Sequence, residues 1–194
     1  MSKIYFYYGA MNSGKSLNLI TTAYSYTSKN KKVMVLTSDL DKRSGFKKIE
    51  SRVGLSIDAE YFNKGTLDKI NQERPDIILV DEAQFLSKED VNVLNAVAGM
   101  YGIPVLAYGL KNDFKGFLFE GSKALLECAD TIREIKTICE ECGERKAVYN
   151  LRIDAENNIV LEGDVIGIDQ VDYNYISVCR NCYFQKLIDV DKQV

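Results

Sequence analysis

The segment Gly9–Ser16, with the sequence GAMNSGKS, fits the phosphate-binding loop pattern G-x-x-x-x-G-K-[ST] at every fixed position. Glycines let several backbone N–H groups point inward together, and the start of a helix offers a partial positive charge to an anion. In this pattern Lys15 reaches the β- and γ-phosphates of a nucleotide and the Ser16 hydroxyl ligates Mg²⁺. A glycine-rich turn that matches by chance is the alternative, but the strand-like Ile4–Tyr8 precedes the motif and the helix-like Leu17–Tyr24 follows it. We therefore predict a nucleotide-phosphate site at Gly9, Ala10, Met11, Asn12, Ser13, Gly14, Lys15 and Ser16.

A second segment that can do chemistry is Ile77–Glu82, a hydrophobic strand that ends in two acids. In phosphate-loop enzymes this strand lies beside the loop, and its Asp holds Mg²⁺ directly or through water, which is the role expected of Asp81. Side chains alternate along a strand, so Glu82 is expected to face another side, where it can act as a general base. The alternatives are a solvated acid at Asp81 and a supporting hydrogen-bond acceptor at Glu82.

Four of the five cysteines form two C-x₂-C pairs, Cys139 with Cys142 and Cys179 with Cys182. Each pair offers two thiolates from one tight turn, and four thiolates suit tetrahedral Zn²⁺. Since no coordination position stays open, the metal is expected to be structural. Free thiols are the alternative. Cys128 stands alone on an apolar helix face, and we interpret it as a buried core thiol.

Two further segments follow strand ends, where ligands of open α/β sheets bind. The charged segment Asp41–Arg52 is either a solvated face or an arm that neutralises phosphate charge through Arg43 or Arg52. The aromatic segment Tyr108–Phe119 is either core cover or a stacking wall for a flat ligand.

Alternating strands and helices must position these segments. Strands are expected at Ile4–Tyr8, Val33–Thr37, Ile77–Asp81, Ile103–Tyr108 and Thr131–Ile135, and helices at Lys15–Lys29, Leu67–Glu73, Lys88–Met100 and Gly121–Cys128. The alternation predicts a parallel sheet with helices on both faces, and Ser87 followed by Asp90 predicts a capped helix start. Beyond Thr137 a turn-rich stretch between Ala147–Ile153 and Ile159–Leu161 predicts a hairpin. We expect residues 1–136 to form a nucleotide-binding α/β domain, residues 137–188 a zinc-binding domain, and residues 189–194 a flexible polar tail.

Composition excludes several classes. With 194 residues and 46% hydrophobic content, the chain can bury a sizeable core. No apolar run approaches the ~20 residues of a membrane span, and a strand that starts at Ile4 leaves no room for a signal peptide. A net charge of −3 argues against a broad nucleic-acid-binding face, and with no His in the chain no imidazole serves as base or ligand. We expect a cytoplasmic protein with neither a membrane nor a nucleic-acid partner.

Taken together, the chain resembles the type II thymidine kinases, the zinc-containing cytosolic class. The resemblance covers about Ile4 to Leu187 and rests on the order and spacing of Tyr7–Ser16, Val80–Phe85, Tyr108–Phe114 and Tyr175–Cys182. It implies a phosphate-loop, RecA-like parallel sheet with flanking helices and a small C-terminal zinc-binding lasso domain. It also implies ATP and deoxythymidine as substrates, Mg²⁺ with ATP, structural Zn²⁺, a homotetramer and feedback inhibition by dTTP. Many members carry Pro and Phe where this chain has Ala10 and Asn12, and neither position supplies a catalytic side chain in the family pattern.

The resemblance also implies roles for single positions. Glu82 matches the base that takes the 5′-hydroxyl proton of deoxythymidine. Asp41 and Arg43 match an Asp-x-Arg near the metal and phosphates, so Mg²⁺ is expected near Ser16, Asp81 and Asp41. A loop between the cysteine pairs is expected to close over the nucleoside and to grip the thymine largely through its backbone. The expected nucleoside-binding positions are Met11, Gln84, Phe85, Leu110, Phe114, Phe119, Val165, Ile166, Gly167 and Tyr175.

Two other functions remain open at this point. A non-kinase NTPase, such as a RecA-like motor or a nucleic-acid repair module, would also suit a zinc ribbon and an Asp-Glu strand end, although the acidic net charge and short length disfavour it. The other is a regulatory nucleotide-binding protein without turnover.

Overall fold

The computed structural model describes residues 3–38, 48–163 and 173–191. The elements in chain order are β1 (Ile4–Tyr8), α1 (Lys15–Thr27), β2 (Val33–Thr37), β3 (Lys48–Glu50), β4 (Ser56–Asp58), β5 (Glu60–Tyr61), α2 (Thr66–Glu73), β6 (Ile77–Asp81), the 3₁₀ helix η1 (Ala83–Phe85), α3 (Lys88–Tyr101), β7 (Val105–Gly109), α4 (Glu120–Cys128), β8 (Thr131–Glu134), β9 (Tyr149–Ile153), β10 (Asn174–Val178) and α5 (Arg180–Asp191).

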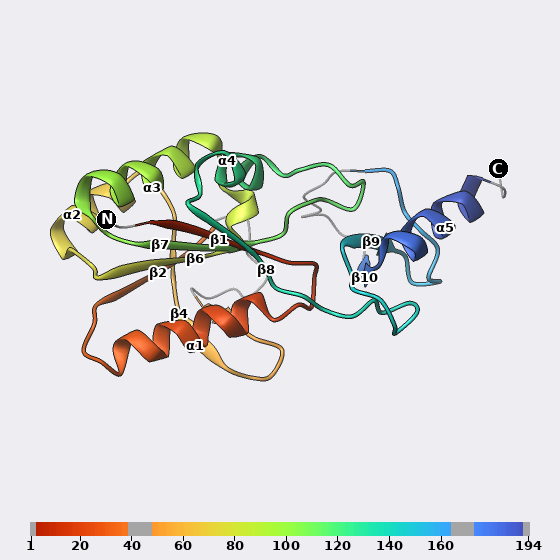
Figure 1. Ribbon diagram of the computed structural model, residues 1–194, viewed down its shortest axis with the longest axis horizontal. Coiled ribbons are helices and arrows are strands. Elements are labelled where there is room, and N and C mark those ends of the chain that lie inside the picture. The colour runs from red at the N-terminus through yellow and green to blue at the C-terminus, as the bar shows by residue number, and fades with distance from the viewer. Residues whose placement is uncertain (1–2, 39–47, 164–172, 192–194) are drawn as a thin grey trace.

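Among the described residues, six strands form one sheet in the order β5-β2-β6-β7-β1-β8, and each neighbouring pair is parallel. The helix α1 covers one face of the sheet, and α2, α3 and α4 cover the other (Figure 1). Both β6 and β7 are buried along their whole length, as expected of parallel strands covered on both faces. The predicted α/β class with a parallel sheet and flanking helices is confirmed.

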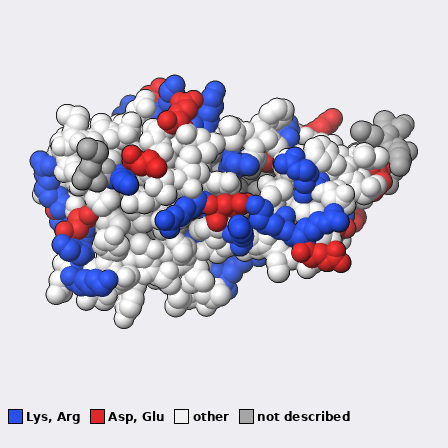
Figure 2. All heavy atoms as spheres, viewed as in Figure 1, with Lys and Arg blue, Asp and Glu red and all other residues white. Residues whose placement is uncertain are grey.

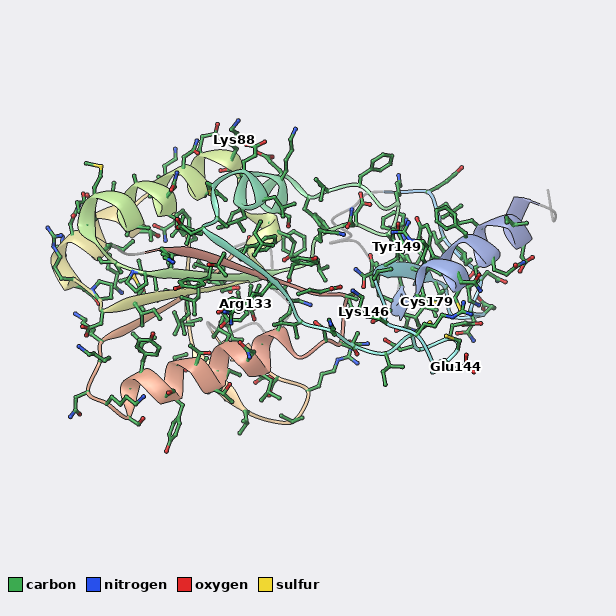
Figure 3. All side chains as sticks on the ribbon, viewed as in Figure 1. Lys88, Arg133, Glu144, Lys146, Tyr149 and Cys179 are labelled. Atoms are coloured by element: carbon green, nitrogen blue, oxygen red, sulfur yellow. The ribbon has the colours of Figure 1, made fainter. Side chains whose placement is uncertain are left out.

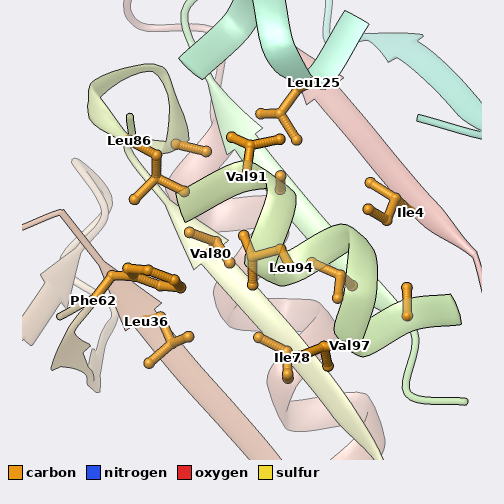
Figure 4. Packing of buried hydrophobic residues seen from close by; sticks show 14 of the residues in the cluster. Ile4, Leu36, Phe62, Ile78, Val80, Leu86, Val91, Leu94, Val97 and Leu125 are labelled. Carbon is orange, nitrogen blue, oxygen red and sulfur yellow. The ribbon is translucent and has the colours of Figure 1, made fainter. Parts of the chain in front are cut away.

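The core between the sheet and α3 shows how the sequence specifies this arrangement. Val91, Leu94 and Val97 recur at helical spacing on α3, and all three are fully buried. They face Ile78 and Val80 of β6 (Figure 4). Burying each side chain of this size contributes about 1.5–3 kcal/mol. The predicted cap of α3 is present as a capping box.

A smaller unit lies beyond the sheet, on the side where the phosphate loop follows β1 (Figure 1). We call it the C-terminal unit; it comprises the antiparallel pair β9–β10, α5 and the two cysteine pairs. Its own small core contains Leu151, Val178 and Tyr183 together with the first cysteine of each pair. An ion pair of 2.6 Å between Lys146 and Glu134 of β8 joins it to the sheet, and Figure 3 shows Lys146 at this junction.

Several of the predicted secondary-structure elements need correction. The fourth predicted strand begins later, at Val105, because the chain at Gly102 turns through a left-handed conformation after α3. The predicted hairpin is only a single bridge between Ile153 and Ile159; β9 instead pairs fully with β10. The strands β3, β4 and β5 and the helix α5 were not predicted. The strands have at most three residues each, too few for a periodic signal.

Two properties of the surface bear on the sequence predictions. No described helix has the length and apolar content needed to cross a membrane. On the face in view in Figure 2, Lys and Arg are interspersed with Asp and Glu.

The division of the chain into two domains at residue 136 stays a prediction. The helix α5 extends to Asp191, three residues into the predicted tail.

Candidate functional site

The predicted phosphate loop connects β1 to α1 at the carboxyl end of the sheet. Gly14 has a φ of 84° and precedes the first residue of α1. At Gly9, an added Cβ would lie 2.4 Å from Ser13 Oγ and 2.5 Å from the Ile135 carbonyl oxygen. Glycine is therefore needed at this position for the loop to close on itself and on the strand end beside it.

The N-terminus of α1 is suited to an anion. Among the described residues, no side chain caps it, and its first turn carries no acid. In α3, by contrast, Ser87 and Asp90 satisfy the first turn. The Ser13 hydroxyl oxygen within the loop is buried without a hydrogen-bond partner among the described residues. Free N–H groups and an unsatisfied hydroxyl are the groups that phosphate oxygens satisfy.

Lys15 lies under the loop. Its Nζ donates to the carbonyl oxygens of Ala10 at 2.9 Å and Gly9 at 3.4 Å. Burial lowers the pKa of Lys15, while the carboxylates of Glu82 and Asp81 act in the opposite direction. A buried ammonium beside free N–H groups provides a point charge for phosphate oxygens.

Asp81, the last residue of β6, reaches the loop although β7 lies between β6 and β1 in the sheet. Its Oδ2 accepts a hydrogen bond of 2.9 Å from the Ser16 hydroxyl. Its Oδ1 is buried without a partner among the described residues. Burial, followed by the charge of Glu82, raises the pKa of Asp81 to about 7. A hydroxyl and an unsatisfied carboxylate oxygen are the oxygen donors that Mg²⁺ prefers, so this pair fits the predicted metal.

Glu82 does not continue β6. Its φ of 49° is left-handed, and it precedes the 3₁₀ turn η1. The direction of the Glu82 side chain is therefore set by this turn. The prediction that Glu82 faces another side than Asp81 because side chains alternate along a strand was wrong about the cause, since Glu82 lies outside β6. Gln84 Nε2 donates to Glu82 Oε2. Both interpretations of Glu82, as a base and as a supporting acceptor, stay compatible with this contact.

The four paired cysteines meet in space, as their spacing predicts. The sulfur atoms of Cys139, Cys142, Cys179 and Cys182 lie within 4.8 Å of one another. Sulfur atoms bound to one tetrahedral Zn²⁺ are roughly 3.8 Å apart, given Zn–S bonds of about 2.3 Å. Figure 3 shows Cys179 in the C-terminal unit. The donor set fits structural zinc and leaves no open position. Cys128 is half-buried rather than fully buried and packs at the edge of the main core.

Comparisons with known proteins agree with this site. The sequence model of the family described as "Thymidine kinase" matches residues 2–183. The chain belongs to the thymidine kinase family. A thymidine kinase of Haemophilus influenzae is 46% identical over 192 residues, which cover 96% of this chain and 98% of that relative. Thymidine kinases of Vibrio vulnificus and Vibrio cholerae are 45% and 44% identical over 193 residues, which cover 96% of this chain and 99% of each relative.

Several of the predicted nucleoside-binding positions of this thymidine kinase family member lie in or near η1. Gln84 is buried, and its Oε1 accepts a hydrogen bond of 3.0 Å from the Leu110 N–H. Phe85 and Phe119 meet edge to face with ring centroids 5.6 Å apart. Phe114 is almost fully buried. The structure thus brings Gln84 to Leu110 and Phe85 to Phe119.

Arg152 is a residue that the sequence analysis missed. Its guanidinium lies 3.9 Å from the ring centroid of Phe114 and 4.6 Å from that of Tyr173, and the side chain is only 1% exposed. It donates to the Glu162 carbonyl oxygen. Tyr175 lies directly opposite Arg152 in the β9–β10 pair, so both side chains emerge on the same face. Arg152 thereby lies against one predicted nucleoside position, Phe114, and beside another, Tyr175, in the strand pair.

Two other predicted residues lie near the loop or the C-terminal unit. Arg52 is exposed in the turn between β3 and β4, and its charge acts on Glu140, which accepts a hydrogen bond from Asn12 of the loop. The backbone of Met11 lies against the C-terminal unit, where its N–H donates to Asn150. The following predicted residues lie outside the described residues: Asp41, Arg43, Val165, Ile166 and Gly167.

Replacing Cys139 with Ser should remove zinc and loosen the C-terminal unit, because Cys139 belongs to both the cysteine cluster and the small core. Bound zinc, measured by elemental analysis, is expected to fall by about half or more. Amide hydrogen exchange should speed up in β9 and β10 and stay slow in β6 and β7. The control is Cys128→Ser, outside the cluster, which should keep its zinc. Full zinc occupancy in the Cys139 variant would contradict the predicted site.

Proposed function

We propose that the chain transfers the γ-phosphoryl group of ATP to the 5′-hydroxyl of deoxythymidine, giving dTMP. A member of the thymidine kinase family is an ATP-dependent nucleoside kinase, a transferase. The observation that supports the proposal most directly is the 2.9 Å hydrogen bond from Ser16 to Asp81, which joins the phosphate loop to the strand that ends beside Glu82.

Each residue in the part of the site that binds ATP, the phosphate donor, has a proposed task. Lys15 and the N–H groups at the start of α1 would hold the phosphates of ATP, and Ser16 and Asp81 would hold Mg²⁺. A bound Mg²⁺ would supply positive charge that offsets the phosphate charge. Glu82 takes the proton of the 5′-hydroxyl as the bond from this oxygen to the γ-phosphorus forms, while the γ-phosphorus bond to the bridging oxygen of ATP breaks and ADP leaves. The family pattern adds Asp41 near the metal and Arg43 near the phosphates.

The part of the site that binds deoxythymidine, the phosphate acceptor, is proposed to lie around η1 and the C-terminal unit. Gln84, whose Oε1 accepts from the Leu110 N–H and whose Nε2 donates to Glu82, is proposed to hydrogen-bond a base edge with its remaining N–H or lone pair. The edge-to-face pair of Phe85 and Phe119 offers an apolar wall for a flat ring. The remaining proposed contacts rest on the family pattern: Met11, Phe114, Val165, Ile166, Gly167 and Tyr175.

Family membership alone carries three further parts of the proposal, which are inhibition by dTTP, a homotetramer and a cytoplasmic location. Initial rates at increasing dTTP would test the first, and sedimentation equilibrium of the purified protein would test the second. Fractionation of cells that express a tagged chain would test the third.

One assay tests the main proposal against its alternatives. Radiolabelled deoxythymidine is incubated with ATP and Mg²⁺, with and without DNA, and the products are separated. Phosphorylated nucleoside supports the kinase. ATP hydrolysis that needs DNA and gives no nucleotide product would favour a motor, and ATP binding without either product would favour a regulatory protein. Lys15→Ala is the inactive reference, and Lys31→Ala, which removes an exposed surface ion pair with Asp76, is its matched control.

A further inference from the structure

The C-terminal unit contacts the phosphate loop at its two central residues, Met11 and Asn12. The Met11 N–H donates to Asn150 Oδ1 at 2.7 Å, and the Met11 carbonyl oxygen accepts from the Ser177 hydroxyl at 2.5 Å. The side chains of Asn150 and Ser177 are 5% and 0% exposed, so water competes little for these bonds. Both backbone polar groups of Met11 are thus held from outside the loop.

Glu140 completes this contact. It lies between Cys139 and Cys142, in the turn of the first cysteine pair. Its Oε1 accepts from the Asn12 amide at 2.9 Å and from the Ser177 N–H at 3.1 Å. It also lies 2.9 Å from the Ser177 hydroxyl oxygen, whose single hydrogen it shares with the closer Met11 carbonyl oxygen. Its own N–H donates to the Ser177 carbonyl oxygen at 2.8 Å. One carboxylate oxygen therefore connects the phosphate loop to β10.

Asn12 has a backbone conformation that benefits from such support. Its φ of 62° is left-handed, where residues other than glycine carry a conformational penalty that Asn tolerates best. The side chain of Asn12 is held by Glu140 rather than by the loop itself. The loop conformation is therefore fixed partly by a residue 128 positions away in the chain.

We propose that Glu140 is a positioning residue for ATP, and that it acts by holding Asn12, and through Ser177 also Met11, in the phosphate-binding conformation of the loop. The inference rests on the proposed function in one respect, that Gly9–Ser16 binds the phosphates of ATP. It extends that function by making the zinc-binding turn part of the support for the donor site.

The chain offers a matched control within the same turn. Glu141 carries the same charge, but it pairs with Lys186 of α5 at 3.0 Å, away from the loop. Glu140→Gln is the conservative variant, because a glutamine keeps the Oε1 acceptor that Asn12 and Ser177 use. Ser177→Ala removes the hydroxyl that contacts the Met11 carbonyl and leaves every cysteine in place.

The experiment measures binding of ATP with Mg²⁺ by calorimetry in the absence of nucleoside, together with zinc content and steady-state kinetics. Glu140→Ala should raise the Kd and the KM for ATP by about three- to tenfold, since a hydrogen bond to a charged group is worth on the order of 1 kcal/mol when partly exposed. The kcat should change less than about twofold, because the variant leaves the reacting groups unchanged. Ser177→Ala should raise the Kd in the same direction. Glu140→Gln and Glu141→Ala should stay within about twofold of the wild type.

An unchanged Kd for ATP in zinc-replete Glu140→Ala would overturn the proposal. An equal increase in Glu141→Ala would overturn it as well, since the effect would then belong to the turn as a whole. If Glu140→Ala loses zinc, the test passes to Ser177→Ala, which leaves every cysteine in place. An unchanged Kd for ATP in Ser177→Ala would then overturn the proposal. Because ATP binding is measured without nucleoside, a wild-type protein that binds ATP but fails to phosphorylate deoxythymidine would refute the proposed function and leave this inference standing.

Discussion

Replacing Glu82 with Gln should lower kcat by about 10²- to 10⁴-fold, which is the usual contribution of a general base. The amide has the size of the carboxylate but cannot accept the proton of the 5′-hydroxyl. The Kd values for ATP and for deoxythymidine should stay within about threefold of the wild type, because the phosphate loop and the aromatic wall are untouched. Single-turnover kinetics and calorimetry would measure the two quantities separately.

The same substitution separates the two interpretations of Glu82. In the structure Glu82 Oε2 accepts a hydrogen bond from the Gln84 side chain. A glutamine at position 82 keeps an oxygen that can accept this bond, so a merely supporting role would survive the change. Loss of turnover with Gln84 still in place therefore points to proton transfer.

The matched control is Glu89→Gln, the same change at an exposed acid in the first turn of α3, which should leave kcat unaltered. Turnover of Glu82→Gln equal to that of the wild type would remove Glu82 from the proposed mechanism. A loss of ATP binding in that variant would show that its effect arises from the donor site.

The parts of the site that the sequence predicts correctly are those that depend on local chain geometry. The loop Gly9–Ser16 needs only glycines and a following helix, and Asp81 needs only the end of an apolar strand. The cysteine pairs are also local, and their spacing alone predicts that the four sulfur atoms can share one metal. In each case a few consecutive residues contain the physical requirement.

The parts that the sequence does not predict depend on contacts between distant segments. The position of β7 between β6 and β1 follows from packing of whole layers and has no motif. The left-handed backbone of Glu82 is unexpected for a residue other than glycine. Arginine side chains are almost always exposed in folded proteins. The sequence therefore gives no reason to expect that Arg152 is buried against the rings of Phe114 and Tyr173. Glu140 looks like any exposed acid until its partner Asn12 is located in space.

Replacing Asp81 with Asn should have opposite effects on activity and on stability. The neutral amide is a poor ligand for Mg²⁺, and a metal ion that neutralises phosphate charge is worth several kcal/mol, so kcat should fall by about 100-fold or more. The apo protein should nevertheless become more stable near pH 8. There the wild type keeps a buried carboxylate whose Oδ1 has no partner among the described residues, and an amide at this site carries no charge.

The pH dependence of this stability gain identifies its cause. Burial, then the charge of Glu82, raises the pKa of Asp81 from 3.8 to about 7, so between these values the native protein binds more protons at this site than the unfolded chain. The free energy of unfolding of the wild type therefore decreases as the pH rises through this window, and Asp81→Asn lacks that decrease. In thermal melts without Mg²⁺, the variant should gain a few degrees over the wild type near pH 8 and clearly less near pH 5. Excess Mg²⁺ with ATP should reduce the difference, because the ligand stabilises the wild type more. A difference in melting temperature that does not change with pH, or a variant less stable than the wild type near pH 8, would show that the ionised Asp81 carboxylate imposes no cost on the apo fold.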